Sequence, residues 1–363
     1  MLKQIYIENF RCLEKTAIKG FSNINLIGGK NNIGKTALLE ALLIYSMPQT
    51  DAISQLKSLY QESKEFIKKM RSKTAWDNFF FQPKNSILLK GEDENNISKK
   101  VEIKILDIQS IPPSITHENY ANWIEILSQN GGKIYPLEIQ VNLNNQQLKP
   151  SFIIETNNAA SLQFNAQTEE LPFLPSSEKI SYEKLTQLYD ESRLNKLDHE
   201  VLNILKIVDS SIESIESFAI GEPNLFVRHK NQSRLPLSLF GDAVNRAAMI
   251  ILKLINNKQN ILLIDEIENG IHYTAQKELW RTLFRLSLEL NVQIFATTHS
   301  LEMIKSFAEV GLENEKNKAL GGYFELTKHF KSQQIIGIKR DLDTLDYAIE
   351  HSKGVRGINT CYT

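Results

Sequence analysis

Gly29-Lys30-Asn31-Asn32-Ile33-Gly34-Lys35-Thr36 is the stretch that decides the fold of this chain. It matches the pattern G-x-x-x-x-G-K-[ST], in which a glycine-rich loop cradles phosphate groups. A short apolar segment, residues 23–27, precedes the stretch, and a strongly helical segment, residues 37–45, follows it. The order strand, glycine-rich loop, helix places the N-terminus of a helix against a bound polyphosphate.

Each position of the loop has a chemical role. Gly29 and Gly34 let the backbone curl so that successive N–H groups point at the β- and γ-phosphate oxygens. Lys35 places a positive charge between those phosphates, and Thr36 supplies a hydroxyl to Mg²⁺. The remaining residues expected to bind the nucleotide from this loop are Asn31, Asn32, Ile33 and Ala37.

A second motif lies far along the chain, where the apolar run 261–264 ends in Asp265 and Glu266. A buried parallel strand explains the apolar run but not the two carboxylates, which stand where α/β sheets place ligand chemistry. Asp265 is expected to orient Mg²⁺, usually through water, and Glu266 to act as general base on the attacking water. The two motifs together make Mg²⁺-dependent ATP hydrolysis the leading hypothesis.

Composition narrows the class of protein. The 363 residues carry 42 Lys and Arg against 43 Asp and Glu, a net charge of −1, so no global field attracts nucleic acid. Two cysteines, Cys12 and Cys361, exclude a disulfide framework and a cysteine-based zinc site. No run approaches a membrane-spanning length, and the N-terminus leads directly into a strand. We therefore expect a cytoplasmic protein without a membrane partner.

Apolar periodicity predicts the order of the elements. Strands are expected at 2–8, 14–19, 23–27, 224–229, 261–265 and 292–296, and hairpins at 86–106 and 136–155. Helices are expected at 37–45, 50–73, 241–254, 274–290 and from Leu301, with two more between 177 and 215 and a strand–helix unit at 334–351. The sequence thus predicts an α/β fold whose two catalytic halves are separated by an inserted region of β-hairpins and a short helical arm.

Several of these segments resemble a known family. Residues 266–272 continue from the acidic pair, residues 295–300 (Phe-Ala-Thr-Thr-His-Ser) close another strand, and the chain opens with Ile7-Glu8-Asn9-Phe10-Arg11. Over about 1–45 and 215–350 the chain resembles the P-loop ABC-type ATPase head of the SMC, RecF and OLD group. The resemblance implies that 268–272 form the loop that communicates across a dimer. It also implies that His299 is the switch histidine at the γ-phosphate and that Arg11 lies near the nucleotide.

An ABC-type head also needs a serine–glycine signature that caps the ATP of the opposite subunit. The best candidate is Leu237–Asp242, with Ser238, Gly241 and Asp242 as the residues that bind nucleotide. One extra residue separates Ser238 from Gly241 compared with the usual spacing. The alternative is an ordinary helix N-cap at Ser238 or Asp242.

The resemblance divides the chain into three parts. Residues 1–175 form an N-terminal ATPase lobe with the P-loop and a β-rich insertion, 176–215 a short helical arm, and 216–363 a C-terminal ATPase lobe. The insertion itself is not recognised, and we expect it to carry specificity for a trigger or partner.

Three other features of the sequence give weaker evidence for functional residues. Gln82 resembles a Q-loop glutamine locally, although it precedes the hairpins that it should follow. The lysines of the helix expected at 50–73 are more typical of a solvated face than of a DNA or partner surface. Asp341-Leu342-Asp343 has the spacing of a metal motif but is better explained as an N-capping cluster.

What the chain lacks narrows its function. The interval between the motifs is too short for SMC-type coiled coils, and residues 300–363 are too few for the TOPRIM nuclease domain of full-length OLD proteins. The resemblance therefore implies a stand-alone OLD-like ATPase, a homodimer or larger assembly. It would act as sensor or scaffold in a prokaryotic anti-phage system beside a separate nuclease or toxin effector. The main alternative is a RecF-like clamp that uses ATP to grip DNA; a transporter subunit and an intrinsic nuclease are less favoured.

Overall fold

The computed structural model describes residues 1–59, 76–106, 134–156, 161–164, 170–176, 181–218, 223–230 and 234–351. Its centre is a six-stranded sheet in the order β10-β14-β15-β3-β16-β17, in which only the β16–β17 pair is antiparallel. Its strands are β3 (Ile24–Gly29), β10 (Phe173–Leu174), β14 (Ile261–Ile264), β15 (Gln293–Thr297), β16 (Gly321–Lys328) and β17 (Ile335–Arg340). In this sheet β3, from the N-terminal part of the chain, lies between β15 and β16, from the C-terminal part.

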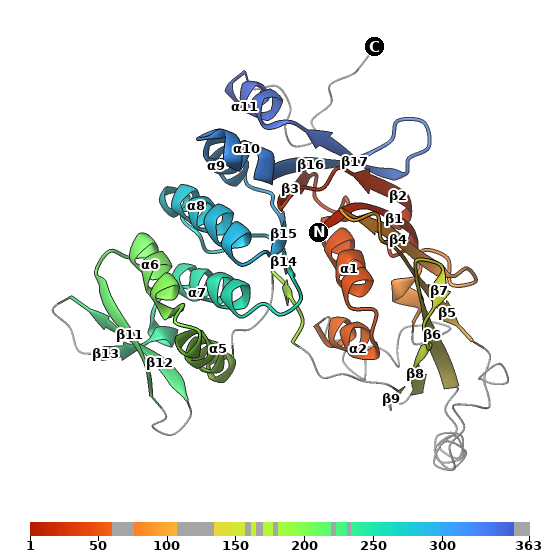
Figure 1. Ribbon diagram of the computed structural model, residues 1–363, viewed down its shortest axis with the longest axis horizontal. Helices are drawn as coiled ribbons and strands as arrows, with labels where there is room; N and C mark the ends of the chain where they lie inside the picture. Colours follow the sequence, from red (N-terminus) through yellow and green to blue (C-terminus); the bar gives the residue numbers. More distant parts are fainter. Residues whose placement is uncertain are drawn as a thin grey trace.

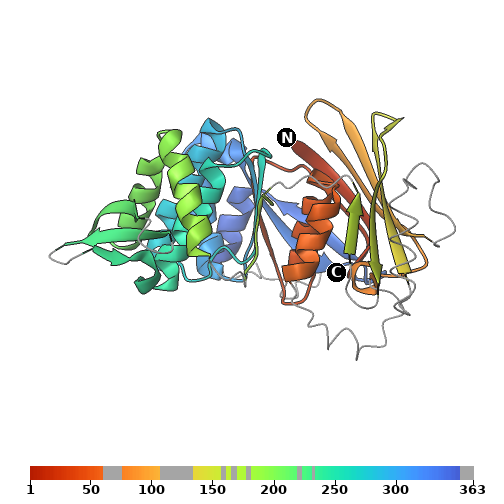
Figure 2. The same ribbon diagram turned by 90° about the horizontal axis from the view of Figure 1, so that it is seen from below.

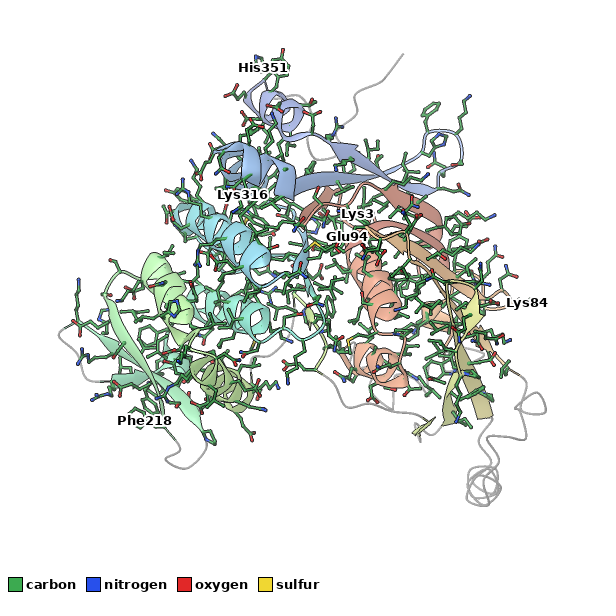
Figure 3. The ribbon with its side chains drawn as sticks, in the orientation of Figure 1. Lys3, Lys84, Glu94, Phe218, Lys316 and His351 are labelled. Atoms are coloured by element: carbon green, nitrogen blue, oxygen red, sulfur yellow. The ribbon has the colours of Figure 1, made fainter. Side chains whose placement is uncertain are left out.

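An antiparallel sheet of eight strands lies beside it, in the order β2-β1-β4-β5-β6-β8-β9 with β7 paired to β6. Its strands are β1 (Leu2–Phe10), β2 (Leu13–Lys19), β4 (Ile87–Asp93), β5 (Ser98–Ile105), β6 (Ile134–Leu143), β7 (Gln146–Gln147), β8 (Ser151–Thr156) and β9 (Ser161–Phe164). The pairs β4–β5 and β6–β8 confirm both hairpins expected from the sequence. At its rim the Lys3 ammonium lies 3.8 Å from the Glu94 carboxylate (Figure 3).

Helix α1 (Lys35–Ser46) lies between the two sheets (Figure 2). Nearly all of its side chains are buried, because one side faces β3, β14 and β15 and the other faces β1 and β4. A helix that is apolar all round is one that is covered on every side. α2 (Thr50–Leu59) follows; the helix expected at 50–73 runs, beyond Leu59, into residues outside the described ranges.

The opposite face of the central sheet is covered by helices α7, α8 and α9 (Figure 1). Their bounds are α7 (Asp242–Ile255), α8 (Tyr273–Glu289) and α9 (Leu301–Gly311). Alternate residues of the sheet enter two cores, so that Leu262 and Ile264 of β14 pack with these helices while Leu263 packs toward α1. The remaining elements at this end of the chain are α10 (Glu315–Leu320) and α11 (Leu342–Glu350).

The region expected to be a helical arm does not project. Helices α5 (Tyr182–Leu194) and α6 (Asp198–Val208) pack against α7, and Leu185, Leu188 and Leu205 are buried in the core that α7 and α8 share. The helices also end earlier than expected, since Ile212 already belongs to a small sheet. That sheet consists of β11 (Ile212–Phe218), β12 (Asn224–His229) and β13 (Arg234–Pro236).

The sequence prediction missed β16, which fills the place beside β3. The N-capping interpretation of Asp341, in contrast, is confirmed, because its carboxylate accepts a hydrogen bond from Thr344 N at 2.8 Å at the start of α11. Two short turns complete the described elements, η1 (Asp77–Phe79) and η4 (Leu237–Leu239). Among the described residues, no helix is both long enough and apolar enough to cross a bilayer.

The contact between β3 and β16 is tight enough to test by substitution. A Cβ placed on Gly28 would lie 2.1 Å from the hydroxyl oxygen of the buried Tyr323 and 2.8 Å from its ring carbon Cζ. We expect Gly28→Ala to lower the free energy of unfolding by about 1–3 kcal/mol through overpacking. Urea denaturation measures this loss.

Two further variants control the experiment. Tyr323→Phe in the Gly28→Ala background should recover only part of the loss, because the ring carbon still obstructs the added methyl group. Gly241→Ala should shift stability by no more than about 0.5 kcal/mol, since nothing lies within 4 Å of a Cβ there. Equal stability of all three variants would show that the β3–β16 contact is looser than described.

Candidate nucleotide site

The loop between β3 and α1 has the backbone expected of a phosphate cradle. Gly29 has φ 144°, Asn32 φ 58° and Gly34 φ 94°, three left-handed positions within one short loop. A Cβ on Gly29 would lie 2.6 Å from the Leu326 carbonyl oxygen, and one on Gly34 would lie 2.8 Å from Cys12 Sγ. Both positions therefore require glycine for space as well as for conformation.

The helix that follows the loop presents a free N-terminus. Gly34, its N-cap, provides no side-chain cap, and no acidic residue occupies the first turn. The first amides of an uncapped helix need external acceptors, and its dipole favours an anion there. Ile33 is buried and anchors the loop, whereas Asn31 and Asn32 are exposed above it.

Lys35 is held at the centre of the site. Its Nζ donates to the carbonyl oxygens of Gly29 and Lys30, both at 2.9 Å, and lies 3.2 Å from Nδ1 of His299. Burial lowers the pKa of this ammonium to about 8, against the opposing effect of three nearby carboxylates. The carboxylates belong to Asp265, Glu268 and Glu266.

Asp265 joins three segments that are far apart in the sequence. The Thr36 hydroxyl lies 3.0 Å from Asp265 Oδ2, and the Thr297 hydroxyl donates to Oδ1 at 2.6 Å. These contacts connect the start of α1 with the carboxyl ends of β14 and β15. Thr36 and Asp265 thus place a hydroxyl and a buried carboxylate side by side, the hard oxygen donors that Mg²⁺ prefers.

Glu266 stands at the open side of this cluster in a left-handed conformation, with φ 48°. Its backbone N–H donates to the Thr297 hydroxyl at 2.8 Å, and its carboxylate accepts from Asn269 Nδ2 at 3.0 Å. The other carboxylate oxygen lies 3.6 Å from Nε2 of His299. Because the Lys35 ammonium can only donate to Nδ1, Nε2 of His299 carries the hydrogen and faces Glu266.

Glu268 is a residue of the site that the sequence analysis did not single out. Its Oε1 accepts hydrogen bonds from the backbone N–H of His299 at 2.5 Å and of Ser300 at 3.2 Å. It therefore connects the loop after β14 with the loop after β15 and fixes the backbone of His299. The signal was present in the sequence as a third carboxylate two positions after Glu266.

Arg11 contacts helix α1, which follows the phosphate loop. Its guanidinium pairs with the buried carboxylate of Glu40, one helical turn after Thr36 on α1, and stacks over the Phe79 ring at 4.9 Å. Burial raises the pKa of Glu40 to about 7, although the Arg11 charge opposes this. The sequence analysis expected Arg11 near the nucleotide, and the structure shows it paired with α1.

The signature-like loop, Leu237–Asp242, leads into helix α7. Gly241 is the N-cap of α7, with no side-chain cap, so the alternative interpretation of Ser238 or Asp242 as an ordinary N-cap is wrong. Ser238, Gly241 and Asp242 are all exposed. A Cβ on Gly270 would lie 3.1 Å from Ala243 N, so the loop after Glu266 packs directly on the start of α7.

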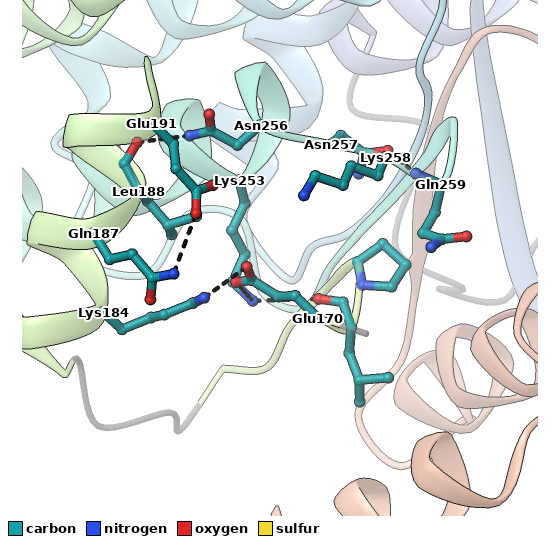
Figure 4. Close-up of a pocket in the computed structure, with 12 residues that line it drawn as sticks. Glu170, Lys184, Gln187, Leu188, Glu191, Lys253, Asn256, Asn257, Lys258 and Gln259 are labelled. Atoms are coloured by element: carbon teal, nitrogen blue, oxygen red, sulfur yellow. Dashed lines mark hydrogen bonds and ion pairs between the residues drawn. The ribbon is translucent and has the colours of Figure 1, made fainter. Parts of the chain in front are cut away.

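Helix α7 is also tied to the backbone of Asp265. The buried Arg246 donates to the carbonyl oxygens of Asp265 at 2.7 Å and of Pro175 at 2.9 Å. Two turns further along α7, Lys253 Nζ donates to Phe173 O at 3.1 Å, beside a cavity of about 420 Å³ between α5 and α7 (Figure 4). Sequence reasoning missed both side chains, because nothing local distinguishes them from other basic helix residues.

Gln82 does not join the site. Its side-chain oxygen accepts a hydrogen bond from Asn85 Nδ2 at 2.9 Å, and its backbone N–H donates to Asn9 Oδ1 at 2.7 Å. Asn9 lies near the end of β1, and Asn85 lies in the segment before β4. The structure therefore gives Gln82 a local role, holding the segment before β4 against the end of β1.

Comparison with known proteins bears on this geometry. The chain is 25% identical over 340 residues to an "ATP/GTP phosphatase" of Helicobacter pylori, covering 87% of this chain and 90% of that protein. A segment of 66 residues, 18% of each chain, is 37% identical to the DNA replication and repair protein RecF of Caldanaerobacter subterraneus subsp. tengcongensis. The SMC head in a crystal structure with the C-terminal winged-helix domain of ScpA aligns with a TM-score of 0.51 at 10% identity, covering 94% of this chain and 98% of that chain.

A family profile covers most of the chain. The profile described as "AAA ATPase domain" matches residues 1–75 and 43–304, and so includes the middle region that the motifs alone did not recognise. The site geometry, the profile and the SMC-head fold agree with one another. The chain belongs to the AAA ATPase domain family and has the fold of an SMC-type ATPase head.

Proposed function

We propose that this protein is a Mg²⁺-dependent ATPase that hydrolyses ATP to ADP and phosphate at the cluster around Lys35. One observation carries the proposal: Lys35, Thr36, Asp265, Glu266 and His299 meet within hydrogen-bonding and ion-pair distances at an uncapped helix N-terminus. A polyphosphate binder without hydrolysis would not need a carboxylate oriented by both Asn269 and His299.

Each side chain has a defined part in the reaction. Lys35 and the amides of the loop bind the phosphates, and the Lys35 ammonium exchanges its carbonyl acceptors for phosphate oxygens. Thr36 and Asp265 would hold Mg²⁺, which neutralises charge on the phosphates when bound. Glu266 accepts the proton of the attacking water, and Asn269 fixes the direction of its carboxylate. His299, between Lys35 and Glu266, is placed to respond to the γ-phosphate.

We further propose that two chains assemble head to head, with the Ser238–Asp242 loop of one copy covering the nucleotide of the other. The uncapped N-terminus of α7 supports this, because its amides need acceptors such as phosphate oxygens. Two large side chains in the loops concerned are exposed: Leu239 is 69% exposed, and Tyr273, at the start of α8, is 63% exposed. Side chains of this kind are typical of an interface.

At the level of biology we propose a sensor or scaffold subunit of a prokaryotic anti-phage system, acting on a separate nuclease or toxin effector. This narrower proposal rests on the OLD-like resemblance of the motifs. Affinity purification with the protein encoded beside it tests the proposal. An ATP-dependent complex would support the role, and its absence with every neighbouring product would contradict it.

A RecF-like ATPase that clamps DNA is the second candidate, favoured by the similarity to RecF over 66 residues. The two candidates differ in their ligand. Retention of plain duplex DNA by the purified protein, dependent on ATP and weakened by salt, would favour the clamp. Unchanged mobility of DNA at low salt with ATP would exclude it.

The general-base assignment predicts a trapped state. Glu266→Gln keeps the hydrogen bond to Asn269 but cannot accept a proton, so the turnover number should fall by about 10²- to 10⁴-fold while ATP binding persists. ATP-bound dimers should then accumulate and elute early in size-exclusion chromatography. Lys35→Ala serves as the comparison, because it should lose nucleotide binding itself. Normal turnover by Glu266→Gln would refute the assignment.

The lowered pKa of Lys35 predicts a pH dependence of binding. A bound polyphosphate favours the ammonium form, so affinity is full below pH 8 and declines as the free protein loses this proton. The dissociation constant for tripolyphosphate should rise about tenfold for each pH unit well above 8. Calorimetric titration between pH 7 and pH 10 measures it.

Lys99 provides a matched control for that titration. Burial also lowers the pKa of Lys99 to about 8, but its Nζ donates to Ser46 O at 3.2 Å, at the opposite end of α1. Lys99→Met should therefore keep the same pH profile for tripolyphosphate. A flat profile in the unmodified protein, or one that disappears in Lys99→Met, would contradict the assignment to Lys35.

A further inference from the structure

The order of strands fixes the direction in which a nucleotide lies, given the proposed ATPase function on which this inference rests. The γ-phosphate end is set by Glu266 and His299, which follow β14 and β15. Both strands lie on one side of β3, and β16 lies on the other. From β14 to β16 there are three strand spacings, about 14 Å, which an extended nucleoside triphosphate can span. A base that extends away from the acidic pair along the edge of the sheet lies toward the carboxyl end of β16.

At that end the β16–β17 hairpin borders the phosphate loop. Ile335, the first residue of β17, has its Cδ1 3.4 Å from the position of a Cβ on Gly34. The hairpin is tied to β2, because the Thr16 hydroxyl donates to Ile335 O at 2.7 Å. Figure 1 shows the hairpin turn extending past the central sheet above β2. The start of β17, where the turn ends, thus lies beside the phosphate loop, and its hairpin lies on the side of β3 opposite β14 and β15.

The turn is closed by backbone hydrogen bonds and carries an exposed aromatic ring. His329 N donates to Gln334 O at 2.8 Å, and Gln333 N donates to His329 O at 2.9 Å. Phe330 at its tip is 91% exposed, more than any other large apolar side chain in the described part of the chain. Lys328, which precedes the turn, is also exposed. Burial raises the pKa of the Cys12 thiol, which lies against Gly34, and the charge of Lys328 opposes this.

We propose that Phe330 is the stacking platform for the purine base of the bound nucleotide, with Lys328 beside the ribose and α-phosphate. A benzyl side chain offers a π-face and no hydrogen-bonding group. Stacking on such a face tolerates any base. The platform therefore adds affinity for adenine and guanine nucleotides alike and does not discriminate between them.

Comparison of ATP, GTP and inorganic tripolyphosphate isolates the base from the phosphates. Phe330→Ala in the full chain should raise the dissociation constants of ATP and GTP by about tenfold, the usual scale for one stacked base. Binding of tripolyphosphate, which has no base, should not change. Phe330→Tyr should restore nucleotide affinity, because it keeps the aromatic face. Isothermal titration calorimetry measures all three ligands.

Leu194 on α5 offers a matched control, since it is 84% exposed and lies in the other half of the molecule. Leu194→Ala should leave all three dissociation constants unchanged. A tryptophan at the turn adds a direct signal: fluorescence of Phe330→Trp should be quenched by ATP and not by tripolyphosphate, above the background of the three native tryptophans.

Three results would overturn the proposal. Unchanged ATP affinity in Phe330→Ala would show that Phe330 does not stack on the base. An equal loss of affinity for tripolyphosphate would show that the turn supports the phosphate loop instead. If the unmodified protein bound none of the three ligands, the ATPase proposal itself would fall. The ligand set therefore separates failure of the base platform from failure of the nucleotide site.

Discussion

The contact on which the site depends is the pair of hydroxyls that hold Asp265. Thr36 begins α1, Thr297 ends β15, and the carboxylate between them ends β14. A buried carboxylate is costly unless its oxygens are satisfied. The two threonines satisfy them and, in doing so, bring the phosphate loop and the acidic pair to one edge of the sheet. Without this contact the two motifs would share a fold but not a reaction centre.

The same aspartate connects the site to the rest of the molecule through its backbone. Arg246 binds the Asp265 carbonyl from α7, the helix whose first turn follows the signature-like loop. Gly270, after Glu266, packs against that first turn. A displacement of the start of α7 by a second subunit would therefore act on Asp265 and Glu266 along a buried, hydrogen-bonded path. This gives the proposed dimer a physical means of controlling hydrolysis.

The sequence predicted those parts that local chemistry encodes. The phosphate loop, the apolar strand before Asp265 and both hairpins have signals of spacing and turn residues. β16 had none, because Gly321, Gly322 and the buried Glu325 obscure an alternating pattern, and Glu325 is tolerated only through its ion pair with Arg340 on β17. Periodicity likewise predicted helices α5 and α6 but not the surface that buries them. Which surface an apolar face meets is a property of the whole fold.

Arg11 and Lys35 are both held by contacts within the protein. Arg11 is paired with Glu40, and Lys35 is bound by carbonyl oxygens and by His299. Phosphate oxygens are stronger acceptors for Lys35 than backbone carbonyls. If phosphate took that ammonium, as proposed, Nδ1 of His299 would lose its donor, while Glu268 would still hold the histidine backbone in place. The imidazole would then be free to reorient between the γ-phosphate and Glu266 without moving the loop. Nucleotide binding would thereby produce a change beside the proposed general base, which is the property that a switch residue requires.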